Sequence, residues 1–424
     1  MITFAAVNNQ SSYIAMRYQI SAPSTVKALI QLPASKSISN RALILNALAS
    51  GNTPPDNLSD CDDTFVMIRA LTQMPETIDI MAAGTAMRFL TAYLSISSGT
   101  HLITGTQRMQ QRPIQILVNA LRELGANIEY AGQEGYPPLR IQGTKLTGNT
   151  LSLPGNVSSQ YISALLMIAP LLPEGLRLNL TGTVISRPYI NLTLQLMKDF
   201  GANADWISTQ AIQIMPQPYK PVPYFIESDW SAASYWYQMA ALAPNAELEL
   251  TGLFKHSYQG DSRGADLFTK LGIETVYTPN GVRLRKTDSR ANRLEEDLAG
   301  IPDLAQTFAV TCCLLGVQFK FTGLQTLRIK ETDRISALKV ELRKLRYILR
   351  DEEDSILYWD GECCQPEAVP VIKTYEDHRM AMAFAPAALR FPNLQIDEPQ
   401  VVTKSYPAYW QHLSQAGFSI REDI

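Results

Sequence analysis

The chain of 424 residues has little of what marks a membrane, nucleic-acid or secreted protein. Its 37 Lys and Arg are balanced by 40 Asp and Glu, so no basic excess points to nucleic acid. The most apolar stretch, between positions 162 and 172, is broken by Ser163 and Pro170 and falls short of the roughly 18 apolar residues of a membrane span. The first residues lack the basic and apolar segments of a secretory signal. We therefore expect a globular cytoplasmic protein of about two or three domains, with no nucleic-acid or membrane partner.

Cysteine is scarce as well, with five residues at positions 61, 312, 313, 363 and 364. They are odd in number and none has the Cys-x-x-Cys spacing of zinc or redox sites, so a reducing cytoplasm fits best. The P-loop pattern G-x-x-x-x-G-K-S/T is absent too, which excludes the common nucleotide-binding loop. Any anion that this near-neutral chain binds must therefore be met by a local cluster of Lys and Arg.

Repeated patterns indicate how the chain is organised. The dipeptide Thr-Gly closes four short runs in which apolar and polar residues alternate, with its glycines at 105, 182, 252 and 323. This alternation predicts strands with one buried face, each ended by the glycine. A second series, LGANIEY, FGANADW and LGIETVY, predicts a helix that ends at glycine and is followed by a strand.

A third series consists of polar residues that stand before apolar runs of helical spacing. After the first member the steps are 74, 70, 74 and 74 residues, and the members are Ser37, Thr85, Ser159, Asp229, Asp303 and Asp377. A period this long is typical of a repeated βαβ-type unit rather than of a solenoid. Six units predict an α/β or α+β fold with mixed sheets. If the six helix starts converge, their unpaired N–H groups form an anion site.

Charged residues gather at these predicted helix starts. Lys36 and Arg41 flank the first start, and Gly84 at the second lets a ligand approach the backbone. Arg108 and Arg112 stand in the loop that follows. In the C-terminal half, cations and carboxylates are mixed within 328–334, 374–380 and 403–407. Runs of charged residues usually lie on a solvated surface. These runs, however, stand in loops before predicted helices, at the same position in the repeat unit as Lys36 and Gly84, so we expect them to line one anion-binding cleft.

A series of segments in this chain resembles one protein family. In order, these are SKSISNRAL, AGTAMRFL, RMQQRPI, YPPLR, VSSQY, SRPYI, QGD, IPD, RIKETDRISAL, TYEDHRMAM and TKSYP. They resemble the 5-enolpyruvylshikimate-3-phosphate synthases of the enolpyruvyl transferase family. The resemblance implies transfer of the enolpyruvyl group of phosphoenolpyruvate to the 5-hydroxyl of shikimate 3-phosphate. Phosphate would be released through a tetrahedral intermediate, on the route to chorismate and the aromatic amino acids. The resemblance also implies a monomer that needs no metal and no organic cofactor.

The same resemblance implies the fold and its division. Two lobes are expected, each of three βαβαββ units. Residues 1–34 and 226–424 would form lobe one, and residues 35–225 would form lobe two, with the active site in the cleft between them. Because many of the site residues are cationic, we expect their repulsion to hold the lobes open until the anionic substrates arrive.

The resemblance also implies the roles of individual residues. Asp303 would serve the 5-hydroxyl and Glu331 the methylene carbon, with Lys36 and Lys404 near the leaving oxygen. Shikimate 3-phosphate would be held by Lys36, Ser37, Arg41, Ser158, Ser159, Gln160, Ser186, Asp303 and Lys330. Phosphoenolpyruvate would be held by Lys36, Gly84, Arg108, Gln160, Arg334, Arg379 and Lys404.

Some positions depart from the family pattern. Ala82 and Thr326 stand where the family has Asn, and Phe89 stands where it has Pro. Thr326 has a shorter reach than Asn, which puts its ligand role in doubt. About 15 residues precede Met16 without a family counterpart, which makes Met16 a candidate for the true start.

Two other functions stay open at this point. UDP-N-acetylglucosamine enolpyruvyl transferases use a loop cysteine five residues before an Arg-Pro pair, but the position five residues before Arg112 is Gln107. A non-catalytic repeat scaffold that binds anions would have no need of Asp303 and Glu331 beside the cations. His378 is expected to be a helix-start residue held by its neighbours rather than a catalyst.

Overall fold

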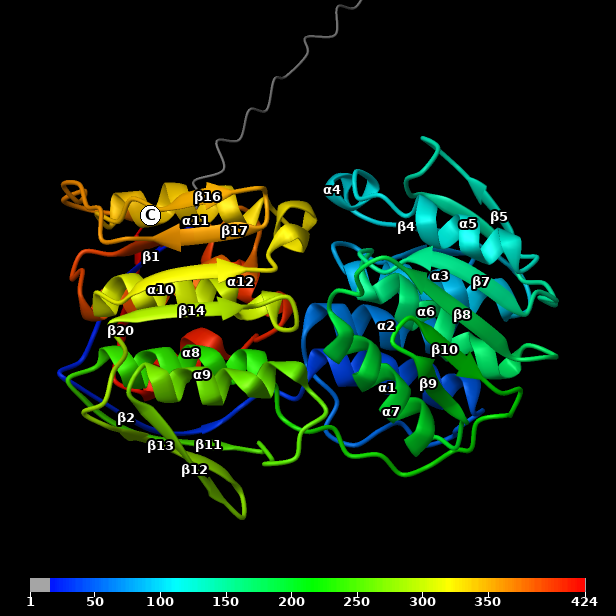
Figure 1. Cartoon of the computed structure of the whole chain (residues 1–424), viewed down its shortest axis with the longest axis horizontal. Helices are drawn as coiled ribbons and strands as arrows, with labels where there is room; N and C mark the ends of the chain where they lie inside the picture. Colours follow the sequence, from blue (N-terminus) through cyan, green and yellow to red (C-terminus); the bar gives the residue numbers. More distant parts are fainter. Residues whose placement is uncertain (1–15, 424) are drawn as a thin grey trace, which may run out of the picture.

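The computed structural model describes residues 16–423 as two lobes that lie side by side (Figure 1). One hydrophobic core joins residues between 20 and 32 to residues between 230 and 418, and we call this part lobe one. The other core comprises residues between 34 and 226, and we call it lobe two. Residues 1–15, which precede the candidate start at Met16, lie outside the described part.

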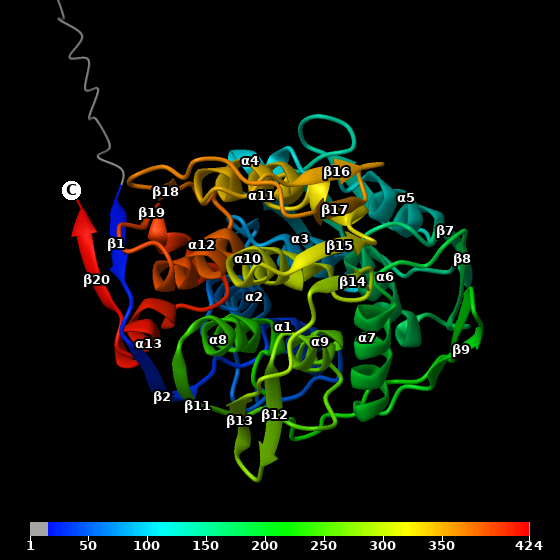
Figure 2. The ribbon, with the colours of Figure 1, turned by 60° about the vertical axis from the view of Figure 1, so that its left-hand side comes forward.

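The chain crosses between the lobes twice, and the two crossings lie next to each other. Ala34 and Ser228 form an antiparallel bridge. The backbone N–H of Ser35 donates to Glu227 at 2.8 Å, and that of Asp229 donates to Pro33 at 2.9 Å. In lobe one, β1 (Arg17–Ser21) pairs with the C-terminal strand β20 (Ser419–Asp423), so both ends of the described chain meet there (Figure 2).

The described residues form five four-stranded sheets of one pattern, in which a parallel pair is followed by two antiparallel neighbours. One sheet of lobe two has the order β3 (Thr77–Asp79), β4 (Thr100–Thr104), β6 (Leu139–Gln142) and β5 (Asn127–Tyr130). The other has the order β7 (Thr150–Pro154), β8 (Leu176–Thr181), β10 (Ala211–Ile214) and β9 (Ala204–Ser208).

Lobe one contains the remaining three sheets of the described chain. The first has the order β12 (Ile273–Thr278), β13 (Gly281–Lys286), β11 (Asn245–Thr251) and β2 (Thr25–Gln31). The second has the order β14 (Arg293–Asp297), β15 (Gln318–Thr322), β17 (Ile356–Trp359) and β16 (Arg350–Glu352). The third has the order β18 (Val371–Ile372), β19 (Gln395–Asp397), β1 and β20.

The strands predicted from the sequence repeats are confirmed. The four Thr-Gly runs are β4, β8, β11 and β15, and the glycines after the last three have positive φ. The second series corresponds to β5, β9 and β12, each preceded by a glycine of positive φ. A positive φ is readily adopted by glycine, which explains why this residue recurs at these positions in several units.

Two helices accompany each repeat unit. In lobe two they are α1 (Lys36–Leu48), α2 (Asp62–Gln73), α3 (Gly84–Ile96), α5 (Gln115–Glu123), α6 (Ser159–Ile168) and α7 (Arg187–Asp199), with the short α4 (Gln107–Gln110) before α5. In lobe one they are α8 (Trp230–Leu242), α9 (Gly264–Lys270), α10 (Ala305–Leu315), α11 (Arg334–Lys344), α12 (His378–Phe384) and α13 (Tyr409–Gln415). Short 3-10 turns include η1 (Ala169–Leu171), η2 (Gly260–Arg263), η3 (Pro302–Leu304), η4 (Gln325–Ile329), η5 (Ala385–Leu389) and η6 (Pro399–Lys404).

The predicted α/β fold is confirmed, with one refinement. Five units carry a four-stranded sheet, whereas the unit that contains α1 and α2 has no such sheet in the described residues. There Asp56 and Phe225 form an isolated parallel bridge. Sequence repeats had predicted six helix starts but could not report that one unit lacks its sheet.

The central helices of each lobe are the ones whose starts were predicted. In lobe two, α1, α3 and α6 contact one another, and in lobe one α10 contacts both α8 and α12. Helix α8 is buried on every side, as expected for a helix at the middle of a core. The capping differs in detail from the prediction, because Ser35 rather than Ser37 caps α1 and Ser158 rather than Ser159 caps α6.

Candidate active site

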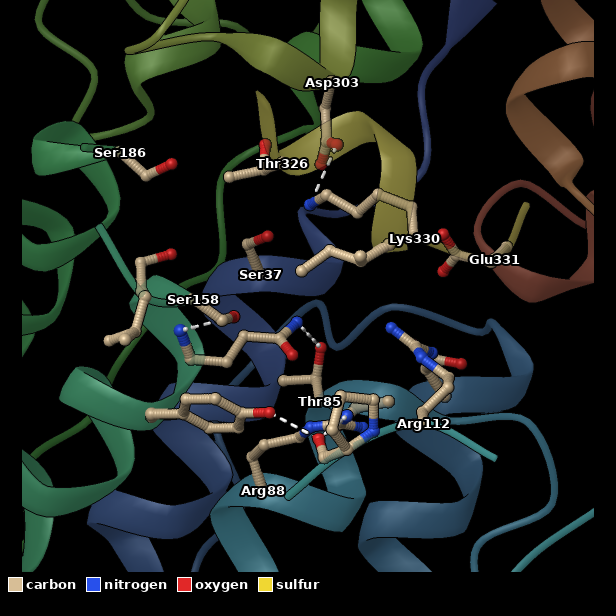
Figure 3. A pocket seen from close by; sticks show the side chains of 18 of the residues that line it. Ser37, Thr85, Arg88, Arg112, Ser158, Ser186, Asp303, Thr326, Lys330 and Glu331 are labelled. Carbon is tan, nitrogen blue, oxygen red and sulfur yellow. Dashed lines mark hydrogen bonds and ion pairs between the residues drawn. The ribbon is translucent and has the colours of Figure 1, made fainter. Parts of the chain in front are cut away.

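The starts of the central helices converge on one cavity between the lobes, with a volume of about 480 Å³ (Figure 3). The starts of α1, α3 and α6 reach it from lobe two, and the turn before α10 and the start of α12 reach it from lobe one. The sixth start, at α8, lines a small neighbouring cavity of about 10 Å³ together with Lys36 and Arg379. The convergence that the helix periodicity predicted therefore exists, and it places several helix N-termini around one space.

Lys36 enters the cavity from the first turn of α1. Its ammonium lies 3.3 Å from the carboxylate of Asp63, which stands in the first turn of α2. Burial would lower the pKa of Lys36, but the surrounding negative groups, first Asp63 and then Cys61 and Glu331, together more than offset this and raise the pKa. Lys36 is therefore a cation.

Asp303 lies at the start of lobe one's α10 segment and is surrounded by cations. Its carboxylate is 2.9 Å from Arg334 Nη1, 3.0 Å from Arg379 Nη2 and 3.4 Å from Lys330 Nζ. Burial would raise the pKa of this carboxyl, but Arg379, Lys330 and Arg334 together hold it well below its usual range. Asp303 is therefore ionised at neutral pH, and its charge is shared among three cations.

Glu331 is the second carboxylate of the cavity. It accepts from Lys404 Nζ at 3.1 Å and from Arg334 Nη2 at 3.0 Å. Burial would again raise the pKa, but Lys404, Arg334 and Arg112 hold it well below the usual range. Both carboxylates therefore face the cavity as anions, on the same lobe and with Arg334 between them.

Arg334 organises this arrangement. Its side chain is only 1% exposed, and Asp377, which is fully buried, accepts from its Nε at 2.7 Å. Asp377 also caps α12 by accepting from the backbone N–H of Arg379 at 2.9 Å. A guanidinium bonded to three carboxylates has few torsional choices left, so Arg334 fixes Asp303 and Glu331 relative to each other.

Lobe two supplies mostly neutral donors and acceptors. Ser158 and Ser159 stand at the start of α6, and Gln160 donates from its side-chain amide to Thr85 Oγ1 at 3.0 Å. Ser186 has a left-handed backbone (φ 52) at the start of α7 and also lines the cavity. These hydroxyl and amide groups suit a polyhydroxylated ligand.

His378 lines the cavity and is almost fully buried. Neither ring nitrogen has a hydrogen-bond partner among the described residues. Burial first, and then the charges of Lys36, Arg379 and Lys404, hold its pKa well below the ordinary value. It is therefore a neutral imidazole at pH 7. His378 begins α12, as expected, and its ring is enclosed by neighbouring residues, although neither ring nitrogen forms a hydrogen bond with a described residue.

Most of the site residues expected from the sequence line the cavity. They are Lys36, Ser37, Gly84, Ser158, Ser159, Gln160, Ser186, Asp303, Lys330, Glu331, Arg334 and Arg379. Lys404 lies one ion pair away, on Glu331. Arg108 is exposed on α4, where its Nε is 3.4 Å from the backbone oxygen of Glu331. That contact joins the two lobes at the edge of the cavity.

Arg41 is placed differently from the expectation. Its guanidinium is buried inside lobe two, where it donates to Thr193 at 2.7 Å, to the backbone oxygen of Ser37 at 2.9 Å and to Ser163 at 3.2 Å. It also stacks on Phe89, one of the positions that depart from the family pattern, at 5.2 Å from the ring centroid. Arg41 therefore braces Ser37 from behind in this structure.

The other two departures lie at or near the cavity. Thr326 lines it, and its buried hydroxyl has no hydrogen-bond partner among the described residues. Ala82 is exposed just before α3. The free hydroxyl of Thr326 is thus available to a ligand, in spite of its short reach.

The substrate-binding roles expected from the family resemblance left out several residues that line the cavity. Of these, Arg112 and Arg88 bring further positive charge, Asp63 forms an ion pair with Lys36, and Thr85 accepts a hydrogen bond from Gln160. Tyr161 donates to Pro113 at 2.5 Å. The sequence does contain a signal for Asp63: an acidic residue in the first turn of a helix, like those at the other predicted helix starts, marks a helix N-terminus.

Two absences hold for residues 16–423. No cluster of three or more His, Cys, Asp or Glu there is arranged to hold a metal ion. No helix in this range is long and apolar enough to cross a membrane. All five cysteines, which lie in this range, are free thiols.

Solved structures define the class of this fold. An EPSP synthase from Acinetobacter baumannii superposes with a TM-score of 0.76 at 22% identity, covering 96% of this chain and all of that one. The enolpyruvyl transferase NikO from Streptomyces tendae superposes with a TM-score of 0.71 at 14% identity, covering 96% of this chain and 99% of that one. The fold is therefore the two-lobed fold of the enolpyruvyl transferases.

Sequence comparison narrows the class to a family. The model of the family "EPSP synthase (3-phosphoshikimate 1-carboxyvinyltransferase)" matches residues 20–80 and 72–413. A 3-phosphoshikimate 1-carboxyvinyltransferase from Bacteroides fragilis (strain ATCC 25285) is 70% identical over 406 residues, covering 96% of this chain and 99% of that protein. One from Vibrio cholerae serotype O1 (strain M66-2) is 37% identical over 414 residues, covering 91% and 96%. The chain belongs to the EPSP synthase family, which confirms the resemblance inferred from its motifs.

Proposed function

We propose that this protein is the transferase that moves the enolpyruvyl group of phosphoenolpyruvate to the 5-hydroxyl of shikimate 3-phosphate and releases phosphate. Two carboxylates, Asp303 and Glu331, stand 2.9 Å and 3.0 Å from the same buried guanidinium, that of Arg334, at the wall of one cavity. This observation carries the proposal, since an addition followed by an elimination needs one group for the hydroxyl proton and one for the methylene carbon.

The charge of the cavity supports two phosphorylated acids as ligands. Its lining contains six cations and three carboxylates, namely Lys36, Arg88, Arg112, Lys330, Arg334 and Arg379 with Asp63, Asp303 and Glu331. The excess of positive charge is met by ligands that carry both phosphate and carboxylate groups, through charge-assisted hydrogen bonds of about 1.5–3 kcal/mol each.

The distribution of polar groups suggests where each substrate lies. The hydroxyl and amide side chains of Ser158, Ser159, Gln160 and Ser186 favour shikimate 3-phosphate on the α6 and α7 side, with Ser37 and Lys330 completing its surroundings. The cations nearer to α3, α11 and α12 favour phosphoenolpyruvate. In this proposal Arg41 acts on the sugar-like substrate through Ser37, whose backbone it holds.

Catalysis is proposed to run through the two carboxylates. Asp303 removes the proton of the 5-hydroxyl as the hydroxyl oxygen bonds to the second carbon of phosphoenolpyruvate. Glu331 is ionised, so the proton added to the methylene carbon comes from the ammonium of Lys404, which donates to Glu331 at 3.1 Å. In the elimination a proton of the new methyl group returns to Glu331 and Lys404, the bond between the second carbon and the phosphate oxygen breaks, and the charge of Lys36 stabilises the phosphate that leaves. Anions that engage Arg379 and Lys330 draw these cations away from Asp303, so substrate binding makes its carboxylate a stronger base.

The two lobes, expected at 1–34 plus 226–424 and 35–225, are proposed to close on the ligands. Contacts between them already exist away from the cavity. Asp62 accepts from Thr403 at 2.7 Å, and Tyr189 donates to Asp261 at 3.0 Å. The cavity is lined from both lobes of one chain, so the proposed activity needs no second subunit, and a monomer remains our proposal.

The competing functions are less favoured. A UDP-N-acetylglucosamine enolpyruvyl transferase would need its cysteine in the cavity, and none of the five cysteines, all in the described part of the chain, lines it. A non-catalytic scaffold that only binds anions would not need two carboxylates, Asp303 and Glu331, held on Arg334 at the wall of the cavity.

One assay separates these functions. Purified protein is mixed with phosphoenolpyruvate and either shikimate 3-phosphate or UDP-N-acetylglucosamine, and inorganic phosphate is measured with time. We expect phosphate only with shikimate 3-phosphate, together with an enolpyruvyl ether of that compound. Phosphate release with the UDP-sugar alone, or with neither acceptor, would refute the proposal.

A further inference from the structure

Glu341 is a carboxylate that the proposed mechanism does not use, although its side chain is 0% exposed. It stands on α11 two turns after Arg334, so the two side chains project from the same face of that helix. A buried carboxylate is unfavourable unless it is paired and hydrogen-bonded. The partners of Glu341 therefore show which part of the molecule its burial serves.

These partners belong to the segment that leads from β18 to α12. Glu341 Oε1 accepts from the hydroxyl of Tyr375 at 2.6 Å, and its Oε2 accepts from the backbone N–H of Lys373 at 3.1 Å. The same Oε2 accepts from Lys344 Nζ at 2.6 Å, and this ammonium also donates to the backbone oxygen of Val371 at 2.7 Å. Glu341 thus holds the segment at three points, two of them directly and one through a lysine.

The segment held in this way ends in a strained turn. Tyr375 and Glu376 both have φ 56, in the left-handed region that residues with a side chain rarely adopt. Such a backbone persists only where the surrounding contacts over-determine it. The hydrogen bonds from Lys373 and Tyr375 to Glu341 are contacts of this kind, because they fix the chain where it enters the turn.

The residues that follow the turn belong to the site. Asp377, the N-cap of α12, accepts from Arg334 Nε at 2.7 Å, and Arg379 Nη2 donates to Asp303 at 3.0 Å. Helix α11 therefore holds the chain on both sides of the turn, through Glu341 before it and through Arg334 after it. Contacts on both sides fix where α12 begins, and with it the position of the Arg379 guanidinium.

We propose that Glu341 is a positioning residue of the active site, which sets the left-handed turn at Tyr375 and Glu376 and thereby the place of Arg379 in the cavity. Glu341 is buried outside the cavity, so it reaches the ligand only through Arg379. The proposal rests on the proposed function in one respect, because it takes phosphoenolpyruvate as the ligand of Arg379.

Steady-state kinetics test this role. In Glu341→Gln the amide has one acceptor oxygen, so its NH2 group faces a donor whichever way the amide turns. We expect the KM for phosphoenolpyruvate to rise about 3- to 30-fold, as for a change that acts through another residue. The KM for shikimate 3-phosphate should change less than about twofold. An unaltered KM for phosphoenolpyruvate would overturn the proposal.

A milder variant guards against a failure to fold. Tyr375→Phe removes one hydrogen bond to Glu341 and leaves the aromatic ring in place. We expect it to raise the KM for phosphoenolpyruvate about 2- to 10-fold, as for the loss of a single hydrogen bond. If Glu341→Gln is not folded by circular dichroism and Tyr375→Phe keeps the unchanged KM, the proposal is wrong.

A matched control separates positioning from a general loss of stability. Glu296 of lobe one is also a nearly buried carboxylate, 8% exposed, and it is held by the two cations Arg263 and Lys270. Glu296→Gln should lower the urea midpoint as Glu341→Gln does, but keep the KM for phosphoenolpyruvate within about twofold. An equal rise of this KM in both variants would mean that destabilisation is the cause, and the proposal would fall.

A double-mutant cycle identifies Arg379 as the residue through which Glu341 acts. In the Arg379→Lys background the guanidinium is absent, so Glu341→Gln should change the KM for phosphoenolpyruvate by less than about twofold further. If the effects of the two substitutions multiply instead, Glu341 does not act through Arg379 and the proposal is wrong.

Hydrogen–deuterium exchange separates the failure of this inference from the failure of the proposed function, because it needs neither substrate nor turnover. In Glu341→Gln we expect faster exchange than in the unchanged protein in peptides that cover residues 372–380, with no change in peptides of α3 and α6. This result supports the positioning role even if phosphate release is never observed. Equal exchange of residues 372–380 in the two proteins overturns it.

Discussion

The most informative substitution is Asp303→Asn. The amide has nearly the size of the carboxylate and its oxygen can still accept from Arg334 or Arg379, but the negative charge that balances three cations is lost. An amide is also unable to take a proton from the 5-hydroxyl. The change therefore removes the proposed base while leaving most of the surrounding hydrogen bonds possible.

The expected size of the effect follows from the geometry. Loss of a positioned general base lowers kcat by about 10²–10⁴, which corresponds to about 3–5 kcal/mol in the activation barrier. The free energy of unfolding should fall by less than the activation barrier rises, because Arg334 keeps its contacts with Asp377 and Glu331. We expect a loss of about 1–3 kcal/mol in the free energy of unfolding, as for weakened hydrogen bonds to charged groups.

Two measurements check this prediction. Phosphate release is followed with both substrates saturating, and stability is followed by urea denaturation. The control is Asp351→Asn, since Asp351 is also held by an arginine and a lysine of lobe one, Arg328 and Lys339, away from the cavity. It should lose some stability and keep kcat within about twofold. If Asp303→Asn stayed within tenfold of the unchanged kcat, Asp303 would not be the base.

Four further predictions follow from the same structure. Glu331→Gln should lower kcat by about 10²–10⁴ in a folded protein, and near-normal turnover would remove Glu331 from the mechanism. His378 stays neutral in the fold whereas an exposed histidine gains a proton near pH 6.5, so acidification below that pH favours the unfolded chain. The free energy of unfolding should therefore fall between pH 7 and 5 by up to about 1.4 kcal/mol per pH unit, and His378→Gln should flatten this slope; an unchanged slope would contradict the buried neutral imidazole. Burial and the charge of Asp303 raise the pKa of Asp261 to about 6, so ionisation of this carboxyl lowers the free energy of unfolding as the pH rises from about 4 to 6. Asp261→Asn should therefore raise the free energy of unfolding by about 1–3 kcal/mol at pH 7.5 but not at pH 4. Finally, small-angle scattering should show a smaller radius of gyration once both substrates are bound, and an unchanged radius would count against closure of the lobes.

Local patterns predicted much of the fold because they reflect local physics. Alternation fixes which face of a strand is buried, and glycines in the left-handed conformation follow the strands β8, β11 and β15 and precede β5, β9 and β12. The six helix starts were found for the same reason. The sheet missing from the unit of α1 and α2 escaped prediction, because strand pairing depends on partners far along the chain, here Asp56 and Phe225.

The sequence predicted which residues belong to the site better than it predicted where their side chains point. Arg41 and Arg112 are two examples of side chains whose direction the sequence did not predict. Arg41 turns into lobe two because Thr193 and Ser163, far away in sequence, accept from it. Arg112 rather than its neighbour Arg108 enters the cavity because Gly84 leaves space there. Such choices depend on tertiary packing, which residue spacing does not encode.

The most direct test of the whole account is a crystal structure of Asp303→Asn with shikimate 3-phosphate and phosphoenolpyruvate bound. We expect both ligands in the cavity of about 480 Å³, with the 5-hydroxyl about 2.6–3.2 Å from the side chain at position 303 and the methylene carbon facing Glu331. Ligands bound outside this cavity, or a 5-hydroxyl turned away from position 303, would contradict the account.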